Sequence, residues 1–196
     1  MRPEICAFSV SEIDPINVQT SKREAERVNL FSAQDVIAIL QEKGRLNGEP
    51  TESQAAWCSK AAAFLGPQVT ERTALTGLLN LVFQYDADAI LKTTEAHVVM
   101  SRYAARDVLR QLALLLLDGA ELNTDRFREI IDKLKEGLDI RGRELFHPLR
   151  LALAGRSGEG ELDRVVLLLD EAAAAGFVTS VKTTRQRILE FCSAFE

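Results

Sequence analysis

From Ser32 to the end of the chain, apolar residues recur every three or four positions, which is the spacing of one face of a helix. Residues that begin or stop helices stand between these segments. Ser32 with Asp35 forms a capping pair ahead of the first segment, and Gly44 stops that segment. Thr183 with Gln186 caps the last segment in the same way. We therefore expect an all-α protein.

The expected helices follow from these signals in chain order. The longest covers residues 94–118, and its nearly all-apolar stretch 112–117 predicts a central place in the core. Gly66 and Pro67 end the helix that starts at Thr51, because proline cannot continue the hydrogen-bond ladder. The remaining expected helices cover residues 32–44, 71–83, 124–137, 144–153, 161–175 and the segment after residue 183.

The expected helices fall into two groups. A boundary near residue 122 separates a first helical subdomain, residues 31–122, from a second one, residues 123–196. Residues 1–30 lack the helical pattern, and we expect an N-terminal arm or linker there. With 196 residues, 46% of them apolar, the chain can form one domain or two small packed subdomains with a sizeable core.

The charge and the cysteines limit the classes of function. A net charge of −5 argues against a broad nucleic-acid-binding surface but not against a local basic patch. The three cysteines, Cys6, Cys58 and Cys192, are far apart and odd in number, which fits reduced thiols in a cytoplasmic protein. No apolar run approaches the ~20 residues that span a bilayer, and no secretory signal opens the chain. We expect no membrane partner.

The residue types that carry catalysis are sparse or wrongly spaced. His97 and His147 have no cysteine or carboxylate at metal-ligand spacing, and no G-x-S-x-G elbow presents a nucleophilic serine. The glycine-rich stretch 155–160 matches neither a dinucleotide fingerprint nor a phosphate-binding loop. We therefore expect no catalytic residue, no metal and no cofactor, and an independent enzyme is disfavoured.

Residues 139–158 form a basic block in an otherwise acidic chain. This block carries a net charge of +2, so the rest of the chain carries −7; its arginines are Arg141, Arg143, Arg150 and Arg156. A local positive surface attracts a polyanion, and the planar guanidinium group binds phosphates and stacks on bases. The simpler alternative is that these arginines pair with neighbouring carboxylates on the surface.

The same block carries a family motif. Residues 142–162 read GRELFHPLRLALAGRSGEGEL. This stretch resembles the pattern G-K-E-L-F-x-P-L-R-x-A-L-T-G-R-x-x-G-P-E-L of bacterial glutamyl-tRNA synthetases, in register and without a gap. The resemblance continues more weakly upstream, through residues 83–92 and 57–72. It implies the C-terminal anticodon-binding region of that family, an all-helical cage of two packed subdomains.

The resemblance also implies a tRNA-binding site. In the family, the arginine of P-L-R lies by the anticodon, and the loop after A-L-T-G helps to read its bases. The candidate tRNA-binding residues that result here are Arg143, Arg150, Arg156, Glu159, Gly160 and Leu162. The implied partner is a glutamate-type tRNA. The family's catalytic signatures do not occur in these 196 residues, so we expect a noncatalytic module rather than an enzyme on its own.

Two departures from the motif keep a second hypothesis open. Ala154 stands where the family has threonine, and Gly160 stands where it has proline, which loosens a loop that should be pre-organised. The alternative is a freestanding protein-interaction or regulatory module that kept the helical scaffold without tRNA binding. In that case the motif persists for packing, and Arg150 only pairs with a helix end.

Overall fold

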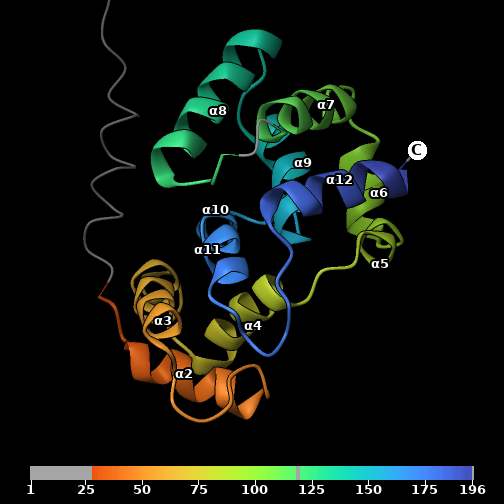
Figure 1. The fold of residues 1–196 in the computed structure, drawn as a ribbon. Coiled ribbons are helices and arrows are strands. Elements are labelled where there is room, and N and C mark those ends of the chain that lie inside the picture. Colours follow the sequence, from red (N-terminus) through yellow and green to blue (C-terminus); the bar gives the residue numbers. More distant parts are fainter. Residues whose placement is uncertain (1–27, 118–119, 196) are drawn as a thin grey trace, which may run out of the picture.

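The computed structural model describes residues 28–117 and 120–195, so Cys6 and nearly all of the expected arm at residues 1–30 lie outside the described part. Within those ranges the chain forms helices and no strand, which confirms the all-α prediction (Figure 1). The helices are α2 (Ala33–Glu42), α3 (Glu52–Leu65), α4 (Arg72–Phe83), α5 (Ala87–Leu91), α6 (Thr94–Met100), α7 (Ala105–Leu116), α8 (Thr124–Leu138), α9 (Arg143–Ala154), α10 (Glu161–Val166), α11 (Leu169–Ala174) and α12 (Thr184–Phe195), and the 3-10 turn η1 (Gly66–Gln68) follows α3.

The helices begin where the sequence places caps. The side chains of Ser32 and Thr51 each accept a hydrogen bond from the amide three residues on, and the side-chain oxygen of that residue accepts one from the cap's own amide. Asn123 caps α8 through its side-chain oxygen, and Thr183 exchanges bonds with Gln186 ahead of α12. Each cap satisfies amide groups that a helix leaves without partners in its own first turn.

The single helix expected over residues 94–118 is wrong, because the structure divides it into α6 and α7. Ser101 follows α6, and its hydroxyl donates to the carbonyl oxygen of Val98, a local bond that competes with the helical ladder. Residues 101–104 form a turn, after which α7 takes a new direction and packs on α9 and α12 (Figure 1).

The helix expected over residues 161–175 is likewise two helices, α10 and α11. The break falls at Leu167 and Leu168, which are both buried. The carbonyl oxygen of Leu168 accepts a hydrogen bond of 3.0 Å from the indole nitrogen of Trp57, 111 positions earlier in the chain. Local periodicity does not reveal this break, because the partner that stabilises it comes from a distant segment.

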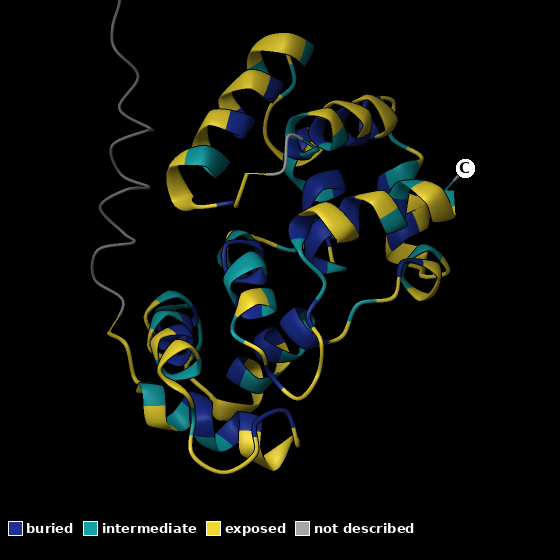
Figure 2. Ribbon diagram, in the orientation of Figure 1, coloured by how far each residue is buried: buried dark blue, intermediate teal, exposed yellow. Residues whose placement is uncertain are grey.

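The helices pack as two groups with α10 between them. In Figure 1, α2, α3 and α4 form one end of the molecule, while α5 to α9 and α12 form the other. Helix α10 contacts α3 and α4 on one side and α9 on the other, and one buried cluster runs through both groups (Figure 2). Helices α5, α6 and α7 therefore pack with α8, α9 and α12, which belong to the expected second subdomain. The subdomain boundary near residue 122 stays a prediction.

A buried arginine joins the two groups. Arg187 on α12 is 0% exposed, and its guanidinium donates to the carbonyl oxygens of Leu81, Val82 and Leu153 at 2.5–2.9 Å, and to that of Lys182 at 3.2 Å. The first two end α4 and the third ends α9, so the negative ends of two helix dipoles face the charge. Burial lowers the pKa of Arg187 to about 10, which leaves the group charged at neutral pH.

Candidate nucleic-acid interface

The family-like motif forms α9 and the loop that follows it. Gly142 stands before α9 with a φ of 58°, and Gly155 ends the helix with a φ of 80°. Both angles lie in the region that glycine adopts without strain, so the chain turns sharply at each end of α9. Between these turns Leu145, Leu149 and most of the later residues of α9 are buried. The polar groups that α9 offers to solvent therefore lie near its first turn and in the loop after it.

Arg150 is the central side chain of this loop, and it is buried rather than open. Only 7% of the residue is exposed. Its Nε and Nη2 atoms donate to the two carboxylate oxygens of Asp163, each at 2.7 Å, and Nη1 donates to the carbonyl oxygen of Gly158 at 2.8 Å. This two-point ion pair ties α9 to α10 and to the loop between them. The expectation that the Arg150 guanidinium is open to RNA is therefore wrong.

The other side of the loop is held by α6. The amide and hydroxyl of Ser157 donate to one carboxylate oxygen of Glu95, at 2.7 and 2.6 Å. Burial by itself would raise the pKa of Glu95, but the Ser157 hydrogen bonds and the nearby charge of Arg156 lower it below the ordinary value. The loop over residues 155–160 is thus fixed from two directions, although its sequence is rich in glycine.

We expect this contact to make stability depend on pH in the acid range. Because the pKa of Glu95 is lower in the folded state, its contribution is present above the unfolded pKa and is lost as the pH falls through the folded value. Glu95→Gln should lower the free energy of unfolding by about 1 kcal/mol at pH 7, since the oxygens are partly solvated. Urea titrations between pH 7 and pH 3 test this, and the difference between variant and wild type should shrink toward pH 3. A difference in the free energy of unfolding that stays constant with pH would contradict the role assigned to the Glu95 carboxylate.

Three arginines of the basic block, Arg141, Arg143 and Arg156, are open to solvent. The side chain of Arg143 is 77% exposed, with its Nη2 atom 4.0 Å from a carboxylate oxygen of Glu159. Arg156 is exposed in the loop and lowers the pKa of Glu95 through its charge. Loose surface pairs of this kind leave a guanidinium group free to exchange its partner for a phosphate.

Arg102 extends the positive surface from the turn after α6. Its Nη1 atom donates to the carbonyl oxygen of Arg143 at 3.3 Å and lies 3.2 Å from Nδ1 of His147. Since the guanidinium can only donate, Nδ1 is the acceptor and the imidazole is neutral. Burial, followed by the charges of Arg102, Arg150 and Arg143, lowers the pKa of His147. His147 on α9 therefore lies among three guanidinium groups.

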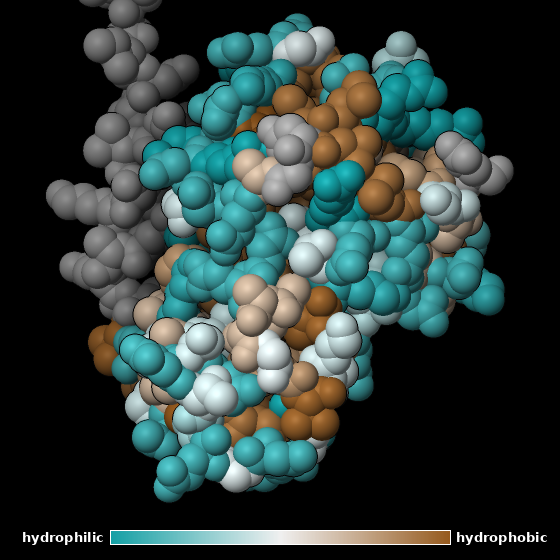
Figure 3. Space-filling view, in the orientation of Figure 1, coloured by the Kyte–Doolittle hydropathy of each residue, from teal (hydrophilic) through white to brown (hydrophobic). Residues whose placement is uncertain are grey.

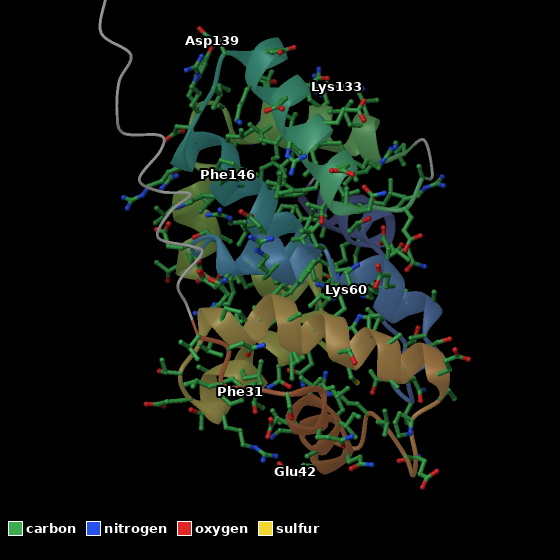
Figure 4. The ribbon with its side chains drawn as sticks, turned by 90° about the vertical axis from the view of Figure 1, so that its left-hand side faces the viewer. Phe31, Glu42, Lys60, Lys133, Asp139 and Phe146 are labelled. Carbon is green, nitrogen blue, oxygen red and sulfur yellow. The ribbon has the colours of Figure 1, made fainter. Side chains whose placement is uncertain are left out.

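A groove of about 640 Å³ opens between α8, α9 and α10. Phe127 of α8 and Phe146 of α9 are half-buried in its wall; Figure 4 shows Phe146 on this face, with Lys133 above it and Lys60 below. Arg150 lies over the Phe146 ring, with Cζ 4.8 Å from the ring centroid. The charged residues that line the groove are Arg128, Asp132, Lys135, Glu159, Glu161, Asp163 and Arg164. Aromatic rings with cations beside them are what proteins use to bind unpaired bases.

A more apolar hollow of about 430 Å³ lies between α7 and α12. Arg106 and Arg110 stand at its rim, while Leu109, Leu114 and Phe195 form much of its lining. Figure 3 shows apolar residues gathered over α7, in contrast to the polar surface around them. Because this lining is mainly apolar, the groove beside α8 is the better candidate for a nucleic acid.

Comparison with known proteins shows the family to which the chain belongs. A family model described as the anticodon-binding domain matches residues 27–172. This chain belongs to that family. The matched residues include α2 to α10 and contain the whole groove, so the domain, its motif and the candidate interface coincide.

Curated relatives of this anticodon-binding domain are glutamate–tRNA ligases. The ligase of Exiguobacterium sibiricum is 25% identical over 162 residues, which are 83% of this chain and 32% of that protein. The ligase of Bacillus subtilis is 24% identical over 135 residues, 69% of this chain and 27% of that protein. The chain spans about a third of the length of these relatives and matches their C-terminal region. No solved structure gives a significant match.

The structure sorts the six candidate residues into two classes. Four are exposed: Arg143 in the first turn of α9, and Arg156, Glu159 and Gly160 in the loop between α9 and α10. Arg150 and Leu162 are buried, and Leu162 is only 3% exposed. A direct base contact by Leu162 would require its side chain to leave the core. The anticodon-binding domain therefore presents the loop and the arginines around it, while these two residues support them from inside.

Sequence reasoning missed the α8 wall of the interface. Phe127 on α8 and Phe146 on α9 each follow the three–four apolar spacing that is typical of core residues, so spacing alone does not mark them as part of an interface. Both are partly buried, but a space remains between α8 and α10 where Arg128 and Lys135 line the groove. Within the described residues, no three His, Cys, Asp or Glu side chains form a possible metal site, and no helix is long and apolar enough to cross a membrane.

Proposed function

We propose that this anticodon-binding domain binds tRNA without catalysis, through unpaired bases of the anticodon loop. The observation that carries the proposal is the groove with Phe127 and Phe146 in its wall and Arg143 beside its rim, where Arg143 lies 4.0 Å from the groove residue Glu159. The proposed partner is a glutamate-type tRNA, because the relatives that the chain matches are named glutamate–tRNA ligases. The proposed location is the cytoplasm.

The charges suggest which parts of the RNA bind in the groove and which bind beside it. Glu159 and Glu161 line the groove and would repel a phosphate there. Carboxylates accept hydrogen bonds from the amino groups of bases, as they do from cytosine in nucleic-acid complexes. We therefore assign bases to the groove and phosphates to the exposed guanidinium groups of Arg143 and Arg156. Arg150 acts as a positioning residue, since it donates a hydrogen bond to the carbonyl oxygen of Gly158 in the loop and lies over the ring of Phe146.

Removing the two arginines assigned to phosphates tests that assignment. Arg143→Ala combined with Arg156→Ala should weaken tRNA binding and make it less dependent on salt. Each lost phosphate contact lowers the slope of log K against log salt concentration by about 0.7 for a single-stranded loop. Fluorescence anisotropy at several salt concentrations measures both effects. Lys43→Ala is the matched control, because Lys43 is an exposed cation at the end of α2, far from α9 (Figure 1). An unchanged slope in the double variant would contradict the assignment.

The tRNA itself provides the second test. The wild-type domain should bind glutamate tRNA more tightly than unrelated tRNAs, and a swap of anticodon bases should remove the preference. Equal binding of all tRNAs would leave only nonspecific phosphate contact. Absence of binding to any tRNA at low salt, together with a protein partner that survives nuclease treatment, would favour the interaction module instead.

A further inference from the structure

The turn between α6 and α7 presents an aromatic side chain with no packing role. Tyr103 is 98% exposed, the most exposed of the large apolar residues in the described part of the chain. Single apolar residues on a surface are ordinary, so exposure by itself carries no conclusion. The ring buries almost nothing in the folded domain, however, and the stability of the fold gives no reason for an aromatic residue here.

The turn that carries this ring is held by hydrogen bonds of the neighbouring residues. Arg102 directly precedes Tyr103, and its guanidinium is bound to the carbonyl oxygen of Arg143 and to His147, both in α9. The start of α6 is fixed in turn by the hydrogen bonds from Ser157 to Glu95. Hydrogen bonds therefore link the turn that carries Tyr103 to α9 and to the loop, which hold the open arginines of the proposed interface.

The charges around the turn favour RNA over an apolar partner. Arg102, Arg106 and Arg143 are the nearby cations, while Glu144 lies 3.9 Å from Arg102 and Asp107 is exposed in the first turn of α7. With Glu159, 4.0 Å from Arg143, this edge holds three guanidinium groups and three carboxylates, and the 77% exposed Arg143 can exchange its loose partner for a phosphate. An exposed ring beside such cations is the arrangement on which proteins stack unpaired bases, with the cations holding the backbone.

We propose that Tyr103 stacks on an unpaired base of the RNA whose phosphates meet Arg143, as a second base contact outside the groove. This inference rests on the proposed function, because it assigns another part of the same tRNA loop to the α6–α7 turn. It extends the interface from the groove beside α8, across the first turn of α9, to α6.

Two substitutions separate stacking from other roles of this residue. Tyr103→Ala should weaken binding of an anticodon stem–loop RNA about tenfold, which corresponds to about 1.4 kcal/mol. Tyr103→Phe keeps the ring and should bind within about twofold of wild type. In a stem–loop that carries 2-aminopurine in the loop, one position should lose fluorescence on binding to wild type and to the Phe variant but not to the Ala variant. Val178→Ala is the control, because Val178 is exposed in the loop that follows α11 and contacts Arg45 near α2.

The outcomes distinguish this inference from the proposed function. If wild type binds the stem–loop and Tyr103→Ala binds equally tightly, the stacking contact is wrong and the tRNA-binding function stands. If the Phe variant is weakened as much as the Ala variant, the ring does not stack and the inference is also overturned. Failure of wild type to bind at low salt would refute the proposed function itself. A protein partner that resists nuclease and is lost in Tyr103→Ala would assign the ring to a protein contact instead.

Discussion

Replacement of Arg187 by leucine is expected to lower the free energy of unfolding by about 3–5 kcal/mol, because each buried carbonyl that loses its donor costs about 1–3 kcal/mol. Arg187 supplies donors to Leu81, Val82 and Leu153, and no part of it reaches solvent. Arg187→Lys keeps the charge but not the planar fork, so it should restore only part of the loss. A domain of this size has about 5–15 kcal/mol in total, so the Leu variant should be close to unfolding at 37 °C.

Urea unfolding followed by far-ultraviolet circular dichroism at pH 7 measures this effect. Arg185→Ala is the matched control, because Arg185 is an exposed arginine two positions earlier in the same helix. Its substitution should change the free energy of unfolding by no more than about 0.5 kcal/mol. A loss below about 1 kcal/mol in Arg187→Leu would mean that water or a rearranged side chain replaces the lost donors.

Removal of Asp163 should have the second large effect. Asp163→Ala leaves the Arg150 guanidinium buried without its carboxylate, and breaking such a pair from one side destabilises a protein by about 3–5 kcal/mol. Asp163→Asn keeps the shape and one acceptor oxygen, so it should cost less. Both substitutions should also weaken tRNA binding, because the loop that ends α9 loses its support through Gly158. Asp88→Asn serves as the control, since Asp88 is an exposed carboxylate in the first turn of α5, outside the groove.

A double-mutant cycle separates positioning by Arg150 from direct contact. If Arg150 positions the loop, Arg150→Leu and Asp163→Asn should weaken tRNA binding to a similar degree. The double variant should then bind tRNA no less tightly than the single variant with the lower affinity, because the two side chains act as one unit. If Arg150 touches RNA directly, Arg150→Leu should be much more harmful, and the two losses should add. Binding should be measured below the unfolding temperature of every variant, so that a loss of affinity does not merely reflect unfolding.

Much of the fold was predictable because helix signals are local. Ser32, Thr51 and Thr183 were each recognisable as caps from residues within one turn, and each cap bond is present. The motif also indicated α9 within a residue at each end, and it placed the loop before α10 correctly. The divided helices at residues 101–104 and 167–168 were missed, because a break in direction depends on what each half packs against. The carbonyl of Leu168 illustrates this, since its indole partner comes from α3.

The candidate site was predictable in composition but not in geometry. The basic block and its arginines were visible in the sequence, and so was the glycine-rich loop. Which arginine is open depends on the position of Asp163, which follows Arg150 by 13 positions and comes from the next helix. The spacing fits a pair, but only the turn of the chain at residues 155–160 brings the two groups within 2.7 Å. The groove exists because α8 and α10 are separated in the fold, and the sequence of neither helix alone determines that separation.

By itself, the sequence determined that this protein is helical, where most helices begin, and that residues 142–162 carry an anticodon-binding motif. Tertiary structure decided that Arg150 and Leu162 support the loop from inside, while Arg143 and Arg156 face solvent and Phe146 faces a groove. The physical reason is the range of the forces involved. Caps and periodicity act within a few residues, whereas burial is the sum of contacts from segments far apart in the chain.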